Sequence, residues 1–401
     1  MPSHNPEKSA EKPKPPALQK WLILLGVLAV ALNLRPALTS IAPLLGDIQQ
    51  VTGLSPGIAG LLTTAPVLCL GIFGPLAPWL AGRIGSERTI GLFLVVLGAG
   101  CVVRATTVPL GLFIGTLMAG AGIGVVGVLL PAVLKREFPD YAARLTGVYT
   151  LLLCLGAAAA AGLTVPVAAH FDNSWRAGLT VWCLPALLAL LVWSPQMRRK
   201  SQPAAAGAPP TAIWKDRVAW QVTLFMGLQS SLAYCVFGWL PFILQTRGVS
   251  VSDSGVTMSV SIGAQLLTAL GGPFIATAFR DQRPAVLLFM GLTLAGLLSI
   301  VYLPLCKVTL WAIVLGLGQG GTFSVALSLI VLRARDATMT GRLSGMAQSV
   351  GYTLAATGPL MVGTFYGWYG NWNAVAVMFC VIALVGTLAG LGAGRRRFVG
   401  E

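Results

Sequence analysis

The sequence predicts an all-α membrane protein whose twelve transmembrane helices form two pseudo-symmetric six-helix bundles. Three observations predict this class. The composition is too apolar for a water-exposed surface. Apolar runs long enough to span a membrane as helices recur along the chain, and short motifs repeat between its two halves.

The composition excludes several classes of protein. Hydrophobic residues make up 56% of the 401 residues and charged residues only 10%, with a mean hydropathy of +0.80. A soluble domain averages about 25% charged residues, and the same numbers exclude disordered, collagen-like and coiled-coil chains. The net charge of +15 would suggest a nucleic-acid partner in a soluble domain. The basic residues lie between apolar runs, so their number is better explained by loops at a membrane surface. We therefore expect no nucleic-acid partner.

The apolar runs are long enough to cross a bilayer, since a helical crossing takes about 20 residues. We expect them to be helices because lipid cannot hydrogen-bond the backbone, so a spanning segment must pair its own backbone groups in a helix or pair with other strands in a closed barrel. The runs before the central polar stretch are residues 21–45, 54–80, 89–103, 110–134, 145–169 and 177–192. The runs after it are residues 218–244, 256–279, 285–305, 308–332, 343–366 and 374–393. The predicted organisation is a tail (1–20), a bundle (21–194), a linker (195–216), a second bundle (217–394) and a second tail (395–401).

Lys and Arg predict the orientation. They lie mostly on alternate connecting segments, beginning with the N-terminal tail. The other set of segments carries only Arg104, Arg176, Arg247 and Lys307. Positive residues favour the cytoplasmic side of a membrane, so we expect both termini in the cytoplasm. The run 21–45 is too long for the apolar part of a cleaved signal peptide.

The two halves repeat short motifs at a common separation. Arg144 begins RLTG at the start of the fifth run, and Arg342 begins RLSG at the start of the eleventh. GAG at 120–122 and GQG at 318–320 have the same separation. Two parallel halves joined by a polar linker are typical of a two-bundle transporter, with its substrate site between the bundles near the midplane.

Several motifs resemble a known family. AGRIGSER at 81–88 resembles the signature cytoplasmic loop of the major facilitator superfamily, without its usual aspartate. The stretches that resemble its bacterial cyanate permease and 2-nitroimidazole transporter branch are NLRPALT (33–39), KREFPD (135–140), AWQVTLF (219–225), GWLP (238–241) and LSGMAQSVGY (343–352). The resemblance implies transport of a small solute by alternating access across a bacterial inner membrane, with spans 1, 4, 7 and 10 lining the cavity. It leaves 2-nitroimidazole-type efflux and cyanate-type uptake open, and a monomer is expected.

Arg35 is the sharpest single candidate for substrate binding. It lies well inside the first run, where an arginine costs about 2.5–3.5 kcal/mol to insert, and no Asp or Glu falls within any predicted span. A solute rich in hydrogen-bond acceptors could complete its surroundings. The alternative is a structural arginine held by the carbonyl that Pro36 frees. Asn33 and Thr39 flank it, and Arg35 and Thr39 are expected to share a helix face.

Other polar side chains in the second half are candidates for the same site. They are Gln229 and Tyr234 on span seven, Gln319 on span ten, and Gln348 and Tyr352 on span eleven. The alternative role for each is hydrogen bonding between helices.

Charged and aromatic residues near the span ends are candidate gates. Trp239, near the outer end of span seven, either shapes a gate or anchors the helix at the membrane interface. The predicted cytoplasmic latch between bundles consists of Arg83, Asp140, Arg144, Asp336 and Arg342. Their alternative role is to set the topology.

Little in the sequence supports catalysis. The cysteines lie in or beside apolar runs without a CxxC pair, and no metal-ligand cluster or buried carboxylate pair is predicted. We therefore expect no cofactor, no metal and no enzymatic activity. A transporter-like sensor that binds solute without moving it is the alternative, and a membrane enzyme is the third interpretation. Facilitated passage, exchange and a proton carried on the solute remain open as transport modes, with Asp47 and His170 as further proton-binding candidates.

Overall fold

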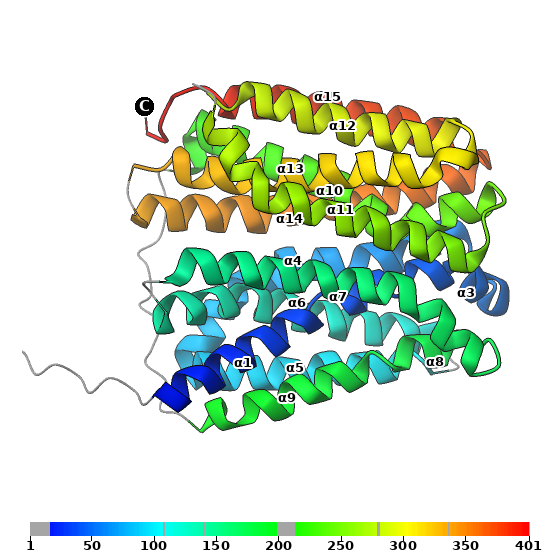
Figure 1. Ribbon diagram of the computed structural model, residues 1–401, viewed down its shortest axis with the longest axis horizontal. Helices are drawn as coiled ribbons and strands as arrows, with labels where there is room; N and C mark the ends of the chain where they lie inside the picture. Colours follow the sequence, from blue (N-terminus) through cyan, green and yellow to red (C-terminus); the bar gives the residue numbers. More distant parts are fainter. Residues whose placement is uncertain are drawn as a thin grey trace, which may run out of the picture.

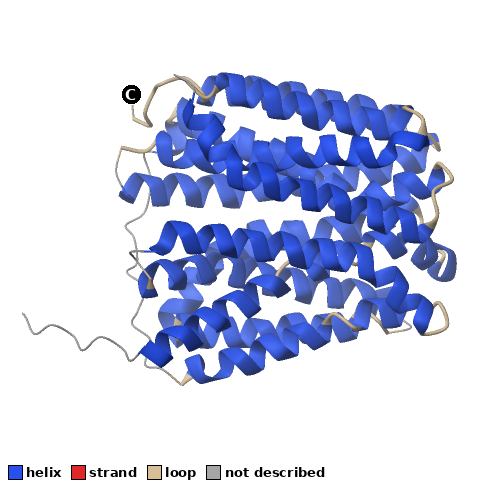
Figure 2. Ribbon diagram, viewed as in Figure 1, coloured by secondary structure: helices blue, strands red, loops and turns tan. Residues whose placement is uncertain are grey.

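The computed structural model describes residues 17–106, 109–138, 141–198, 213–278, 281–335 and 337–400. These residues form helices and connecting turns, and no strand occurs among them (Figure 2). The chain thus forms the predicted all-helical fold, because each apolar run satisfies its backbone hydrogen bonds internally.

The first half begins with an interrupted span. Its pieces are α1 (Ala17–Asn33), α2 (Pro36–Thr39), the 3₁₀ turn η1 (Ala42–Leu44) and α3 (Leu45–Thr52). The helices that follow in this half are α4 (Pro56–Ile84), α5 (Ser86–Val103), α6 (Pro109–Glu137), α7 (Ala142–His170), α8 (Trp175–Thr180) and α9 (Cys183–Met197). The first and sixth spans are therefore both broken along their length.

The second half contains the turn η3 (Ile213–Lys215), helices α10 (Arg217–Thr246), α11 (Val251–Ala278) and α12 (Arg283–Tyr302), the turn η4 (Leu305–Lys307), and helices α13 (Val308–Leu332), α14 (Ala337–Tyr369) and α15 (Asn373–Ala393). Among the described residues, 10 helical segments are long and apolar enough to cross a membrane. Helices α11 and α14, with 28 and 33 residues, complete the twelve crossings of the fold.

Helix packing is pseudo-symmetric. In the first half α4 and α5 both pack on α6, and α9 packs on α1 and α5. In the second half α11 and α12 both pack on α13, and α15 packs on α10 and α12. Each of these contacts thus has its counterpart six spans later, which gives two bundles of similar internal arrangement (Figure 1).

The two bundles meet along two helix pairs, α4 with α14 and α7 with α11. Both described termini, Ala17 and Gly400, lie at one end of the molecule, which we call the termini end; α3 lies at the opposite, far end (Figure 1).

Close contacts hold the bundles together at the far end. A Cβ atom built on Gly255 of α11 would lie 2.5 Å from the Ala161 carbonyl oxygen of α7. Gln245 of α10 donates to the Pro43 carbonyl oxygen of η1 at 3.0 Å. These contacts between the bundles close the far end of the interface.

Candidate functional site

A cavity of about 620 Å³ lies between the bundles. Both bundles line it, and its lining extends toward the termini end as far as Pro78 of α4, Pro131 of α6 and Gly341 of α14. Each of these three residues lies within two turns of the helix end at that side. No described lining residue comes from the far-end segments, so the cavity opens toward the termini end.

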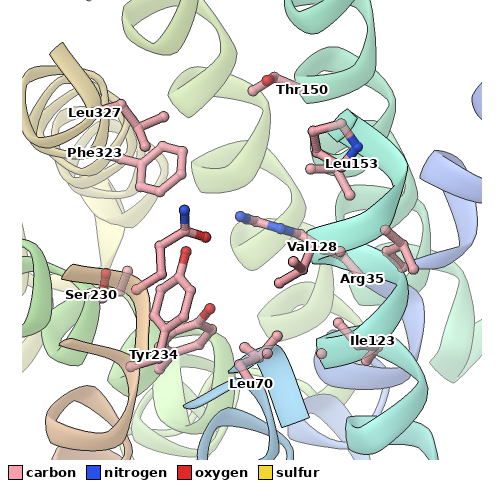
Figure 3. A pocket seen from close by; sticks show the side chains of 18 of the residues that line it. Arg35, Leu70, Ile123, Val128, Thr150, Leu153, Ser230, Tyr234, Phe323 and Leu327 are labelled. Atoms are coloured by element: carbon pink, nitrogen blue, oxygen red, sulfur yellow. The ribbon is translucent and has the colours of Figure 1, made fainter. Parts of the chain in front are cut away.

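Arg35 sits at the break in the first span and points into this cavity (Figure 3). α1 ends at Asn33 and α2 begins at Pro36, whose ring removes the backbone donor for a continuous helix. The guanidinium carbon lies 5.5 Å from the centroid of the Phe237 ring on α10, a cation–π contact between the bundles.

The Arg35 guanidinium has no hydrogen-bond acceptor and no ion pair within the described residues. Its electrostatic neighbours are Cys154 and the hydroxyl groups of Tyr149, Tyr234 and Tyr352. Among the described lining residues it is also the only charged side chain. Its N–H donors therefore face the cavity without an acceptor among the residues that the structure describes.

Asn33 and Thr39, the predicted companions of Arg35, do not line the cavity. Asn33 donates through Nδ2 to the Ala29 carbonyl oxygen at 2.8 Å, and Thr39 donates to the Ala157 carbonyl oxygen of α7 at 3.0 Å. The helical turn from Arg35 to Thr39 is kept, since the Thr39 backbone N–H donates to the Arg35 carbonyl oxygen at 3.2 Å, but Arg35 lines the cavity whereas Thr39 is buried against α7. Both residues instead stabilise the broken backbone.

The candidates of the second half do line the cavity: Gln229, Tyr234, Gln319, Gln348 and Tyr352. The Tyr234 and Tyr352 rings meet edge to face, with centroids 6.2 Å apart. Tyr234 extends toward Arg35 from the other side of the cavity (Figure 3). Helices α10 and α14 thus present aromatic groups opposite the guanidinium.

The three glutamines also bond within the second bundle. Gln229 donates to Ser230 Oγ at 2.8 Å, and Gln348 donates to Ser344 Oγ at 2.8 Å. Gln319 accepts from Gln265 Nε2 at 3.0 Å. These bonds fix the amide groups at the cavity wall, so the predicted alternative of interhelical hydrogen bonding holds for Gln319 in addition to its exposure to the cavity.

Sequence reasoning missed several polar residues of the lining, among them Tyr149 and Cys154 on α7 and Gln265 on α11. These three residues lie on spans five and eight, from which no solute-binding residue was predicted. A polar side chain inside an apolar run was the available signal, and it was weaker than that of Arg35 because these groups cost less to bury.

Trp239 is fully buried and donates through Nε1 to the Pro359 carbonyl oxygen of α14 at 2.9 Å. Its ring also lies 3.4 Å from where a Cβ atom on Gly60 of α4 would be. It is therefore packed between the bundles near the far end, with its ring buried by protein.

The predicted latch is described only in part. Arg83 stacks on Trp79 of its own helix, with the guanidinium carbon 4.0 Å from the ring centroid, and Arg342 lies half-buried in α14. Asp140 and Asp336 lie outside the described residues, as does the side chain of Arg144. At this end Arg136 of α6 pairs with Glu87 of α5, and this contact lies within one bundle.

Known proteins resemble this chain over most of its length. Residues 23–359 match the family described as Major Facilitator Superfamily. The chain is 37% identical over 392 residues to the uncharacterized transporter YycB of Bacillus subtilis (strain 168), covering 95% of this chain and 96% of that protein. It is 38% identical over 381 residues to the 2-nitroimidazole transporter of Escherichia coli (strain K12), covering 93% and 95%. It is 30% identical over 370 residues to the cyanate transport protein CynX of the same organism, covering 90% and 95%.

Solved structures share the fold at much lower sequence identity. A bacterial homolog of the human lysosomal transporter Spinster superposes with a TM-score of 0.76 at 15% identity, covering 96% of this chain and 100% of that one. A D-xylose–proton symporter superposes with a TM-score of 0.75 at 15% identity, covering 94% and 98%.

Proposed function

The chain belongs to the major facilitator superfamily and is a multi-pass membrane transporter, and from this premise we propose that it carries a small, planar, acceptor-rich solute of the 2-nitroimidazole kind. The solute binds beside Arg35 and crosses by alternating access between the two bundles. The observation that carries this proposal is the Arg35 guanidinium, which faces the cavity without an acceptor among the described residues.

The chemistry of the cavity wall supports this class of solute. A guanidinium presents parallel N–H donors that match two oxygens on one atom, as in a carboxylate or a nitro group. Tyr149, Tyr234 and Tyr352 add aromatic surface and hydroxyl groups around the same volume. A ring that carries a nitro group uses both features at once.

Cyanate is the second candidate. The positive charge of Arg35, unopposed among the described lining residues, favours an anion, and one relative is a cyanate transport protein. A three-atom anion leaves the tyrosine rings without a partner, however, and its uptake into a negative-inside cell costs about 2.3 kcal/mol per 100 mV. The geometry therefore favours the nitroaromatic solute.

The transport mode that the cavity supports best is facilitated passage or exchange. The described lining contains no Asp, Glu or His, so it offers no carboxylate or imidazole for proton coupling. We further propose that the termini end faces the cytoplasm of a bacterial inner membrane, since Lys and Arg concentrate on the segments at that end. The described conformation is then open to the cytoplasm, as release or capture of a solute on that side requires.

Counterflow of labelled 2-nitroimidazole in proteoliposomes tests the proposal. We expect accumulation by the wild type, and a loss of about tenfold or more for Arg35→Ala and Arg35→Lys, because lysine cannot supply the two-donor fork. Arg198→Ala, which removes an exposed arginine at the end of α9, is the control and should behave as wild type. Normal counterflow by both Arg35 variants would overturn the assignment.

The same preparation separates the alternatives. Binding of 2-nitroimidazole without counterflow would indicate a sensor. Counterflow of labelled cyanate that excess 2-nitroimidazole does not inhibit would favour the second candidate.

A further inference from the structure

A second arginine, Arg104, is fully buried at the far end of the first bundle. It follows α5 directly and was expected on an exterior loop as a topology charge. Helix α6 leaves room for it through Gly115, where a Cβ atom would lie 2.3 Å from the Arg104 backbone nitrogen. A charge removed this completely from solvent requires strong compensation.

The compensation for Arg104 comes from the two interrupted spans. Its Nη1 donates to the Ala37 carbonyl oxygen of α2 at 2.9 Å. Its Nη2 donates to Ser40 Oγ at 3.1 Å and to the Leu179 carbonyl oxygen of α8 at 3.1 Å. Carbonyl groups in the last turn of a helix lack a helical donor, so the guanidinium satisfies acceptors that the breaks in spans one and six create.

We propose that Arg104 is a positioning residue for Arg35. Two of its three acceptors, Ala37 and Ser40, follow Arg35 by two and five positions in the same broken segment. The third acceptor fixes this segment to α8. Arg104 thus holds the backbone that leads out of the break, and with it the direction in which Arg35 enters the cavity. The inference rests on the proposed role of Arg35.

The second bundle supplies a matched control. Arg247 follows α10 at the same end of the molecule, and its guanidinium donates to the carbonyl oxygens of Ile300 and Leu303, the latter at 2.8 Å. Both arginines therefore donate to backbone carbonyl oxygens at the far end of their bundle. The acceptors of Arg247 belong to the end of α12, a helix that contributes no described residue to the cavity.

The test measures affinity and stability separately on the purified full-length chain in lipid nanodiscs, with 2-nitroimidazole as the probe. For Arg104→Met we expect a Kd about tenfold weaker and faster amide hydrogen exchange in residues 34–41. Arg247→Met should lower Tm but leave the Kd within about twofold and the exchange of residues 34–41 unchanged.

Two milder variants decide the question if Arg104→Met does not fold. Arg104→Lys reaches fewer acceptors at once, and Ser40→Ala removes one of the three, so both should weaken binding by about two- to tenfold. The inference is overturned if these variants lower Tm while the Kd and the exchange of residues 34–41 stay at wild-type values. Wild-type affinity in Arg35→Ala would instead refute the proposed function, and the exchange measurement would still report whether Arg104 holds the segment.

Discussion

At the scale of single residues, two arginines without a described carboxylate partner have opposite roles. Arg104 finds three acceptors in the protein and is buried among them, whereas Arg35 finds none among the described residues and faces the cavity. The sequence suggested a structural arginine held by freed carbonyls as the alternative for Arg35. In the structure that arrangement belongs to Arg104.

The tyrosine hydroxyls give a residue-scale prediction. Tyr149 lines the cavity, and its hydroxyl forms no hydrogen bond within the described residues, so Tyr149→Phe removes a group that is available to a solute. We expect an affinity for 2-nitroimidazole about two- to tenfold weaker with an unchanged Tm. Equilibrium binding and thermal unfolding measure the two quantities.

Tyr302→Phe is the control for this prediction, since the Tyr302 hydroxyl bonds Asn373 Oδ1 at 3.0 Å, at the far end and away from the cavity. An affinity for Tyr149→Phe equal to that of the wild type would remove Tyr149 from the site.

At the scale of elements, the broken spans decide which side chains meet. Arg35 lies at the break between α1 and α2 and lines the cavity, whereas Thr39, one helical turn later, is buried and donates to the Ala157 carbonyl oxygen of α7. Closure of the far end likewise depends on glycines that let helices from different bundles approach.

Gly255 gives the element-scale prediction. A valine at this position would push α11 away from Ala161 of α7, so Gly255→Val should favour conformations open at the far end. We expect faster hydrogen exchange at the far-end halves of α7 and α11 and a free energy of unfolding lower by about 1–3 kcal/mol.

Gly263 lies on the same helix, and a Cβ atom built on it would have no neighbouring atom within 4 Å. Gly263→Val should therefore exchange and unfold like the wild type. Equal exchange in the two variants would show that the α7–α11 contact does not close the far end.

At the scale of the whole molecule, the sequence allowed the architecture to be predicted more fully than the site. Bilayer thickness fixes the length of each apolar run, so the number of crossings follows from composition. The run 89–103 was short because α5 begins earlier, at Ser86, where Glu87 is buried and its carbonyl accepts from Trp193. Arg35 stood out by its insertion cost. Burial of Arg104 and the cavity position of Tyr149 depend on contacts between distant spans, which residue spacing cannot reveal.

Orientation gives the whole-molecule prediction. Cys306 is exposed in η4 at the far end, and the other six cysteines are buried or half-buried within helices. If the termini end faces the cytoplasm, a membrane-impermeant maleimide should label intact cells at Cys306, and Cys306→Ser should abolish the signal. Labelling that requires permeabilised cells would reverse the orientation.

The charge of Arg35, which has no acidic partner among the described residues, also affects the step in which the empty carrier returns to its starting conformation. When both ends close, the guanidinium of an empty carrier loses the water that solvates it in the open state, and desolvating a lone ion costs several kcal/mol. A bound nitro group or anion offsets that cost. The loaded carrier should therefore reorient faster than the empty one. Solute present on the side to which the carrier delivers its cargo should then increase the rate at which solute leaves the opposite side.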